Sequence, residues 1–166
     1  MEKKLKSSYI IRFSDCDLFG HLNNARYIDY FLNAREDHLK SYYDMDLRTF
    51  HLQGSSWFVA GHEIMYLKPA IYGERVVIYS SLIQLAEDTL LVELLMMDEQ
   101  ETHLKSICWT RFTPVNVKTG KRETHTADFT TFANSVLVDE VNVDAGLKSR
   151  MATLLAQLKQ QKTISA

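Results

Sequence analysis

Four strand-like segments follow one another between residues 56 and 117, and this run constrains the fold more than any other feature of the chain. Each segment is rich in Val, Ile, Leu, Tyr, Trp and Thr, and breaks of only a few residues separate them. The predicted strands span residues 56–68, 75–86, 89–98 and 103–117. Short connections favour antiparallel pairing of neighbouring strands, so the sequence predicts an antiparallel meander.

One long amphipathic segment, residues 25–43, supplies the partner that such a sheet needs. Apolar residues such as Ile28, Phe31 and Leu39 recur at helical spacing on one side of it. A further strand is predicted at residues 9–13. The chain therefore predicts an α+β fold in which a curved antiparallel sheet of about five strands buries one face against a single long helix.

Length and composition indicate one globular domain over residues 1–166. The chain is 46% hydrophobic and 24% charged, which excludes a disordered or fibrous protein. Its net charge of −2 argues against a nucleic-acid surface. Residues 122–166 form a less certain extension, with a short helix expected at 127–133, a strand-like segment at 136–143 and an amphipathic helix at about 145–160.

The N-terminus lacks the apolar run of a secretory signal, and no stretch is apolar enough to span a membrane, so we expect a cytoplasmic protein. The two cysteines, Cys16 and Cys108, form neither a disulfide framework nor a zinc-binding pattern. We expect no metal and no cofactor. Cys16 is a poor candidate nucleophile because the flanking acids disfavour a thiolate.

The loop between the first strand and the helix contains several side chains that could take part in catalysis. It contains Asp15, Asp17 and His21, and it ends at Asn23 and Asn24 beside the helix N-terminus. The first N–H groups of a helix lack intrahelical partners and favour developing negative charge. A carboxylate facing such a site is the minimum for acyl transfer. The alternative is that this Asp-x-Asp only forms a turn or a cap.

Residues 15–27, Asp-Cys-Asp-Leu-Phe-Gly-His-Leu-Asn-Asn-Ala-Arg-Tyr, resemble the signature of the hotdog-fold acyl thioesterases. That group includes hydroxybenzoyl-CoA thioesterase and, more distantly, the plant acyl-ACP thioesterases. The resemblance extends more loosely over residues 9–117, with residues 63–74 similar to the family's second-strand segment, and it fades after Lys121. It implies the hotdog fold, in agreement with the pattern of strands and helix.

The resemblance also implies a catalytic set. Asp17 would be the essential carboxylate, acting as general base on water or as nucleophile. The backbone N–H of Asn24 would bind the thioester carbonyl. His21 matches a histidine of the acyl-ACP branch, where it assists the carboxylate, but Phe19 stands where that branch has an asparagine. The remaining motif residues have structural roles in the turn, the cap and the packing: Asp15, Asn23 and Tyr27.

The expected substrate is an acyl-CoA or acyl-ACP thioester, whose acyl group would occupy an apolar tunnel. Candidate substrate-binding residues are Phe19, Asn23, Phe31 and Met65. The acyl chain length and the carrier stay open. Two other functions compete: a non-catalytic acyl-CoA-binding regulator and a hotdog dehydratase. Because a single curved sheet leaves edge strands to be covered, we also expect a homodimer or homotetramer.

Overall fold

The computed structural model describes residues 1–164, except for the side chains of residues 162 and 164; the last two residues of the predicted domain therefore lie outside the described part. The strands are β1 (Leu5–Ile10), β2 (Ser55–Tyr66), β3 (Arg75–Ala86), β4 (Thr89–Asp98) and β5 (Leu104–Asn116). The helices are α1 (Asn24–Tyr43), α2 (Leu47–Leu52), α3 (Ala127–Val136) and α4 (Gly146–Ile164), and two short 3₁₀ turns are η1 (Phe13–Asp15) and η2 (Val143–Ala145).

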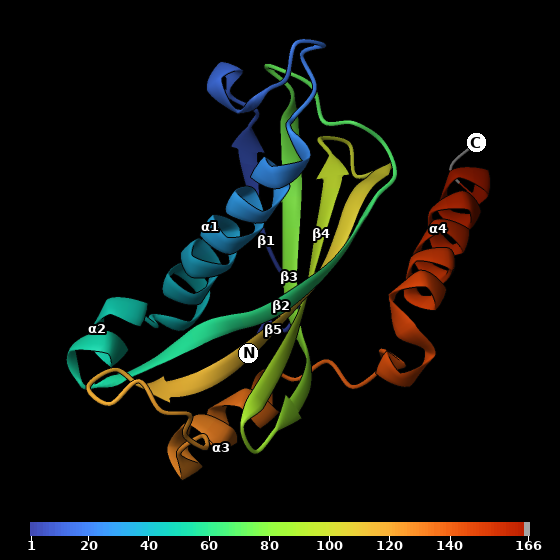
Figure 1. The fold of residues 1–166 in the computed structure, drawn as a ribbon. Helices are drawn as coiled ribbons and strands as arrows, with labels where there is room; N and C mark the ends of the chain where they lie inside the picture. The colour runs from blue at the N-terminus through green and yellow to red at the C-terminus, as the bar shows by residue number, and fades with distance from the viewer. Residues whose placement is uncertain (165–166) are drawn as a thin grey trace.

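The described strands form one antiparallel sheet with the order β1-β3-β4-β5-β2 (Figure 1). The meander predicted for four consecutive strands is correct for β3, β4 and β5, but wrong for β2, which crosses the sheet and pairs with β5. The eight residues between Tyr66 and Arg75 make this crossing to β3, and they loop out at the end of the sheet that carries the β1–α1 connection. β1 and β2 are the two edge strands.

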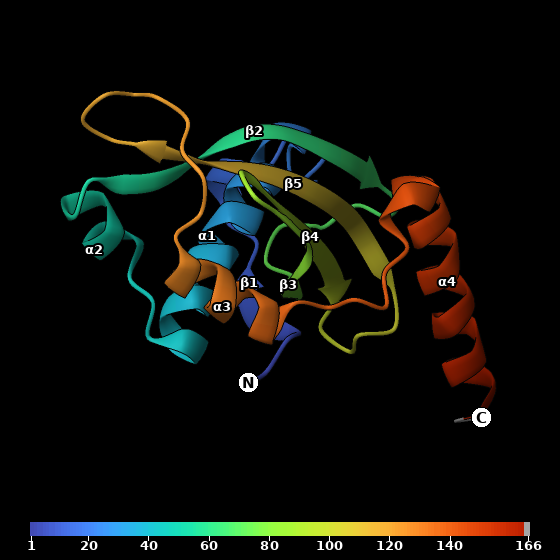
Figure 2. The ribbon, with the colours of Figure 1, turned by 90° about the horizontal axis from the view of Figure 1, so that it is seen from below.

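α1 lies in the concave face of the curved sheet, as Figure 2 shows. Register shifts between Val59 and Gly61 in β2 and between Leu82 and Gln84 in β3 are bulges, which bend strands. Phe31 is 1% exposed and packs into a core between α1 and the inner face of the sheet. The predicted hotdog arrangement is therefore confirmed.

The outer face of the sheet carries a second core, covered by residues 137–145 and α4 (Figure 2). The strand expected at 136–143 is absent from the described structure, but Val138 and Val141 of that segment are buried against the sheet. In α4, Arg150 makes an ion pair with Glu93 at 2.8 Å, and both side chains are buried or nearly so. The C-terminal extension is thus folded onto the domain.

Two other boundaries differ from those predicted. β1 runs over residues 5–10 rather than 9–13, because the polar residues Ser7 and Ser8 still pair with β3. The connection between α1 and β2 contains the short helix α2, which the side chain of Asp46 caps by accepting a hydrogen bond from the N–H of Arg48 at 2.8 Å. None of the helices in the described residues is long and apolar enough to cross a membrane.

Candidate active site

The β1–α1 loop folds tightly around the carboxylate of Asp17. Its Oδ1 accepts the backbone N–H groups of Phe19 at 2.9 Å and of His21 at 3.1 Å. The N–H of Asp17 donates to the carbonyl of His21, and Gly20 adopts a φ of +73°, which favours glycine at the turn. Asp17 is exposed, and its Oδ2 accepts no hydrogen bond from any residue that the structure describes. The backbone therefore orients one oxygen of Asp17 and leaves the other without a hydrogen bond from the described residues.

The loop ends at the positive end of α1. Asn23 is the N-cap, and its side chain accepts a hydrogen bond from the N–H of Ala25 at 3.1 Å, as predicted for a capping residue. Asn24 is the first helical residue, so its N–H precedes any intrahelical acceptor. This geometry suits the binding of a partial negative charge at the N–H of Asn24.

A second loop, between β2 and β3, holds the first one in place. The N–H of Leu22 donates to the carbonyl of Ala70, and the N–H of Tyr72 donates to the carbonyl of Gly20, both at 2.8 Å. The hydroxyl of Tyr27 accepts the buried N–H of Ala70 at 2.9 Å. Tyr27 thus makes a hydrogen bond to the supporting loop in addition to the packing expected from the sequence.

Lys105 of β5 fixes the far side of this supporting loop. Its ammonium lies 2.7 Å from a carboxylate oxygen of Glu74 and donates to the carbonyl of Pro69 at 2.9 Å. Sequence reasoning missed this residue, since Lys105 is distant in sequence from both loops. The similarity of residues 63–74 to the family segment was the signal that this part of the chain belongs to the site.

The two acids of the motif have different surroundings. Asp15 is partly buried, and its Oδ2 accepts the hydroxyl of Tyr30 at 2.9 Å, while its backbone carbonyl accepts the N–H of Asn23. These contacts fit the predicted structural role of Asp15. The ring of His21 lies near that of Phe19, and among the described residues its imidazole makes no hydrogen bond to Asp17. The expected assistance of Asp17 by His21 is therefore not preorganised in this chain.

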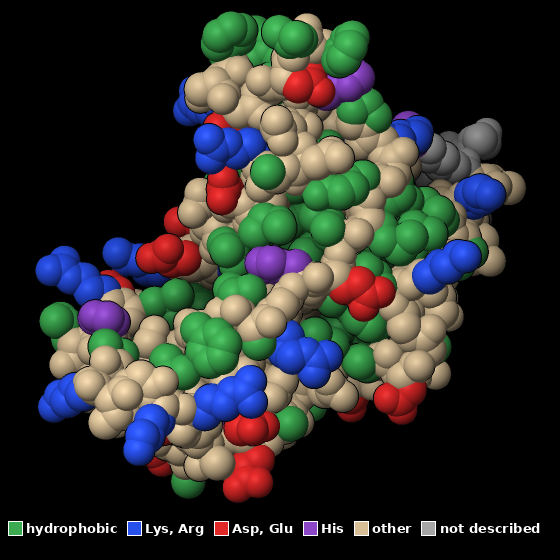
Figure 3. Space-filling view, in the orientation of Figure 1, with side chains coloured by type: hydrophobic (Ala, Val, Ile, Leu, Met, Phe, Trp, Pro, Cys, Tyr) green, Lys and Arg blue, Asp and Glu red, His purple; other side chains and the backbone are tan. Residues whose placement is uncertain are grey.

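Large apolar side chains surround the loop on the surface. Leu18 is fully exposed, Phe19 is 83% exposed and Phe13 is 78% exposed. Hydrophobic side chains accordingly gather at the top of Figure 3, over the end of the molecule where this loop lies. We call Phe13, Leu18 and Phe19 the apolar tip.

The three apolar residues predicted to line one acyl tunnel are not brought together within the chain. Phe19 is in the exposed tip, Phe31 belongs to the inner core, and Met65 packs in the outer core on the other face of the sheet. Residue alternation along β2 explains the separation, because Ile64 packs in the inner core and Met65 in the outer one. Within the described chain these three residues do not line one tunnel, and their part in substrate binding stays a prediction.

The environment of both cysteines disfavours the thiolate form. Burial raises the pKa of the Cys16 thiol, and Asp15 and Asp17 raise it further, which disfavours a thiolate. Burial also raises the pKa of Cys108 to about 11. No group of three or more His, Cys, Asp or Glu side chains that could hold a metal ion occurs in residues 1–164.

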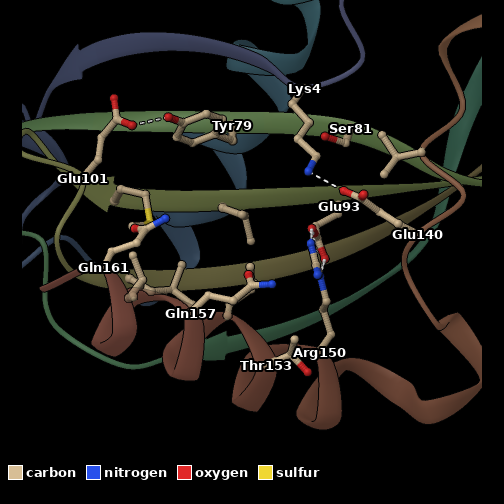
Figure 4. A pocket seen from close by; sticks show the side chains of 16 residues that line it. Lys4, Tyr79, Ser81, Glu93, Glu101, Glu140, Arg150, Thr153, Gln157 and Gln161 are labelled. Atoms are coloured by element: carbon tan, nitrogen blue, oxygen red, sulfur yellow. Dashed lines mark hydrogen bonds and ion pairs between the residues drawn. The ribbon is translucent and has the colours of Figure 1, made fainter. Parts of the chain in front are cut away.

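A cavity of about 630 Å³ lies between α4 and the outer face of the sheet, away from Asp17 (Figure 4). Its charged side chains neutralise one another. Arg150 pairs with Glu93 and Lys4 pairs with Glu140. Glu101 accepts the hydroxyl of Tyr79 and pairs with Lys6. This cavity is consequently satisfied without a charged ligand.

Comparison with known protein families identifies the family of this chain. The model of the thioesterase-like superfamily matches residues 11–151, which include the whole loop, α1 and the sheet from β2 to β5. The chain belongs to the thioesterase-like superfamily. No curated protein matches its sequence. Membership in this superfamily supports a thioester hydrolase activity in general terms.

This superfamily member is similar in structure to several solved proteins. With DHNA-CoA thioesterase from Staphylococcus aureus it has a TM-score of 0.74 and 18% identity over 80% of this chain and 90% of that one. With the 1,4-dihydroxy-2-naphthoyl-CoA thioesterase from Synechocystis the values are 0.72 and 14%, over 80% and 97%. With a hypothetical protein from Staphylococcus aureus in complex with CoA they are 0.74 and 15%, over 86% and 90%. At these identities the likeness shows a shared fold.

Proposed function

We propose that this protein hydrolyses acyl-CoA thioesters and that Asp17 is its essential carboxylate. The observation that carries the proposal is the state of that exposed side chain: two backbone N–H groups orient Oδ1, while Oδ2 has no hydrogen-bond partner among the described residues. A positioned carboxylate is suited either to take a proton from water or to attack the thioester carbon. Membership in the thioesterase-like superfamily supports this role.

The N–H of Asn24 would stabilise the oxyanion that forms at the thioester carbonyl. It belongs to the first residue of a twenty-residue helix, so the helix dipole adds to its positive potential. The supporting loop at residues 67–74 keeps the catalytic loop in register with this helix start. Rigid placement of donors is the usual source of most of the rate enhancement in acyl transfer.

CoA is the carrier that the comparisons favour over acyl-carrier protein. One structurally similar protein is in complex with CoA, and two are named for CoA thioester substrates. The departure at Phe19, where the acyl-ACP branch has asparagine, supports the same choice. Phe19 and its apolar neighbours would contact the substrate.

A homodimer would complete this site. β1 and β2 are edge strands with unpaired backbone groups on one side, and the apolar tip is almost fully exposed beside Asp17. Large exposed apolar patches mark interfaces or binding sites. A second protomer that pairs along β2 would cover this edge strand and would contribute side chains that line the acyl-binding site. Light scattering should show a dimer or a larger homo-oligomer; a fully active monomer would contradict the proposal.

The decisive test is turnover of a panel of acyl-CoA thioesters, detected through the released thiol, together with calorimetric binding of the same compounds. We expect turnover in the wild type and a fall in kcat of about 100-fold or more in Asp17→Asn, with folding intact. His21→Ala should cost less, and Asp15→Asn should act mainly through stability, because Asp15 bonds to Tyr30. Binding without turnover would identify a regulator instead, and a greater loss at Asp15 would move the catalytic role to that residue.

A further inference from the structure

A small cavity lies on the inner face of the sheet, at the end opposite the Asp17 loop. It has a volume of about 200 Å³ and lies between the C-terminal half of α1, α3 and strands β2 to β5. Tyr43, the last residue of α1, stacks edge to face on Phe132 of α3, with the ring centroids 5.2 Å apart. Most of its wall is apolar, including Leu39, Phe129 and Phe132.

Arg35 is a charged residue in this wall, and its partly buried guanidinium has no acid beside it. Among the described residues its only hydrogen bond runs from Nη1 to the hydroxyl of Ser80 at 3.3 Å, and no carboxylate lies within 4.0 Å of it. Glu36 is the other charged residue of the wall, but it is exposed and makes no ion pair with Arg35. Burial lowers the pKa of Arg35 to about 10, which leaves the side chain protonated at neutral pH.

The residues that are hydrogen-bonded to Arg35 through Ser80 do not neutralise its positive charge either. Ser80 is also bonded to Nδ1 of His38 at 2.7 Å, and Nε2 of His38 is bonded to Ser7 at 2.7 Å. The first acid reached along this network is Asp37, beyond the hydroxyl of Tyr9 at the surface. An unpaired cation in an apolar wall is costly to the fold, so its presence calls for a functional explanation.

Most of the hydrogen-bond donors of Arg35 are unused among the described residues. Arg35 presents five donors, of which one is used. The unmet hydrogen-bonding capacity of this cavity is therefore on the donor side, and a ligand that satisfies it must bring oxygen atoms and negative charge. The larger cavity under α4 has no such deficit, because its charges are already paired.

We propose that this cavity binds an apolar carboxylic acid, with its carboxylate on Arg35 and its hydrocarbon part among Phe129, Phe132 and Leu39. A guanidinium binds a carboxylate through two parallel hydrogen bonds, which makes it selective for this group. Drug-sized ligands occupy about 300–1,000 Å³, so a cavity of about 200 Å³ fits a medium-length chain or a single ring. The carboxylate is either that of a free acid or the far end of an acyl group carried as a thioester.

Calorimetric titration of the full-length protein with octanoate and with octanamide, its neutral counterpart, tests the free acid. We expect the wild type to bind octanoate at least tenfold more tightly than octanamide, and Arg35→Met to lose this preference. Lys40→Met, which removes an exposed cation of the same helix, is the matched control and should keep it. Equal binding of the two compounds by the wild type, or an unchanged preference in Arg35→Met, would overturn the proposal for the free acid.

Thermal unfolding of the same variants separates a binding role from a structural one. Arg35→Met should be at least as stable as the wild type, because it removes an unpaired cation from an apolar wall. A large loss of stability in Arg35→Met would count against the proposal, since it would assign Arg35 to the fold. Arg35→Lys is a second variant, which keeps the charge without the planar fork, and its octanoate preference should fall rather than vanish.

The other possible ligand, an acyl group that carries a carboxylate at its far end, rests on the proposed thioesterase function and has its own assay. The assay compares hydrolysis of two acyl-CoA substrates of equal chain length, one with and one without a terminal carboxylate. The wild type should hydrolyse the substrate with the carboxylate faster, and Arg35→Met should hydrolyse both at the same rate. Absence of turnover with every thioester would refute the proposed function, whereas the octanoate preference would still stand. Absence of both preferences would refute the carboxylate site.

Discussion

Acid should destabilise this protein through His38, and the size of the effect follows from its surroundings. His38 is 1% exposed, and its two ring nitrogens face the hydroxyls of Ser7 and Ser80 at 2.7 Å. Burial and, to a smaller extent, the nearby charge of Arg35 lower the pKa of His38 from 6.5 to about 4, against a smaller opposing effect of Asp37. The folded protein therefore holds His38 in its neutral form.

The unfolded chain binds a proton at His38 more readily than the folded protein does, so this contribution to stability is complete above pH 6.5 and is lost as the pH falls toward 4. The difference between the two pKa values corresponds to about 3 kcal/mol in all, and to about 2 kcal/mol at pH 5. For a chain of this length, 2 kcal/mol corresponds to a fall in Tm of about 4–8 °C.

Urea unfolding at pH 7.5 and at pH 5.0 measures this contribution directly. The free energy of unfolding of the wild type should fall by about 2 kcal/mol more than that of His38→Gln, which has no titrating ring at this position. His51→Gln, which changes an exposed histidine of α2, is the control and should follow the wild type. The same pH dependence in His38→Gln and in the wild type would refute this reasoning.

Three further substitutions test the frame around the site. Arg150→Met leaves the carboxylate of Glu93 buried with only the indole of a tryptophan, and should cost about 3 kcal/mol in urea unfolding, most of it recovered when Glu93→Gln is added. Tyr27→Phe leaves the buried N–H of Ala70 without its acceptor, so unfolding should require about 1–3 kcal/mol less and kcat should fall through the supporting loop. Gly20→Ala places a side chain at a φ of +73° and should lower the free energy of unfolding by about 1 kcal/mol. Substitutions at exposed loop positions away from this turn should leave the free energy of unfolding unchanged.

The fold was predictable wherever local pattern and tertiary environment agree. The boundaries of β3 and β4 match the predicted ones, and α1 begins one residue before its predicted start, because alternation, helical spacing and the Asn23 cap are all local signals. Pairing was less predictable. Nothing in residues 55–66 distinguishes a partner in β3 from one in β5, since both are apolar strands, and the choice depends on the loop that carries β2 across the sheet.

The site shows the same division. The sequence motif identifies Asp17, Asn23 and Asn24, whose positions follow from one turn and one helix cap. Residues that act on this loop from elsewhere, such as Lys105, depend on strand order and were missed. The side chain of Met65 lies on the outer face of the sheet, away from Phe31, because neighbouring residues of a strand point to opposite faces.

The crossing of β2 has a consequence for the order in which the protein assembles. β3, β4 and β5 are joined by short turns, so their pairing closes small loops and should form early. β1 and β2 find partners far along the chain, with Leu5 opposite Ser80 and Tyr66 opposite Ser106, and their closure costs more entropy. The loop with Asp17 follows β1, and its supporting loop follows β2. We therefore expect hydrolytic activity to appear in refolding only with the slowest kinetic phase, after most of the sheet is in place.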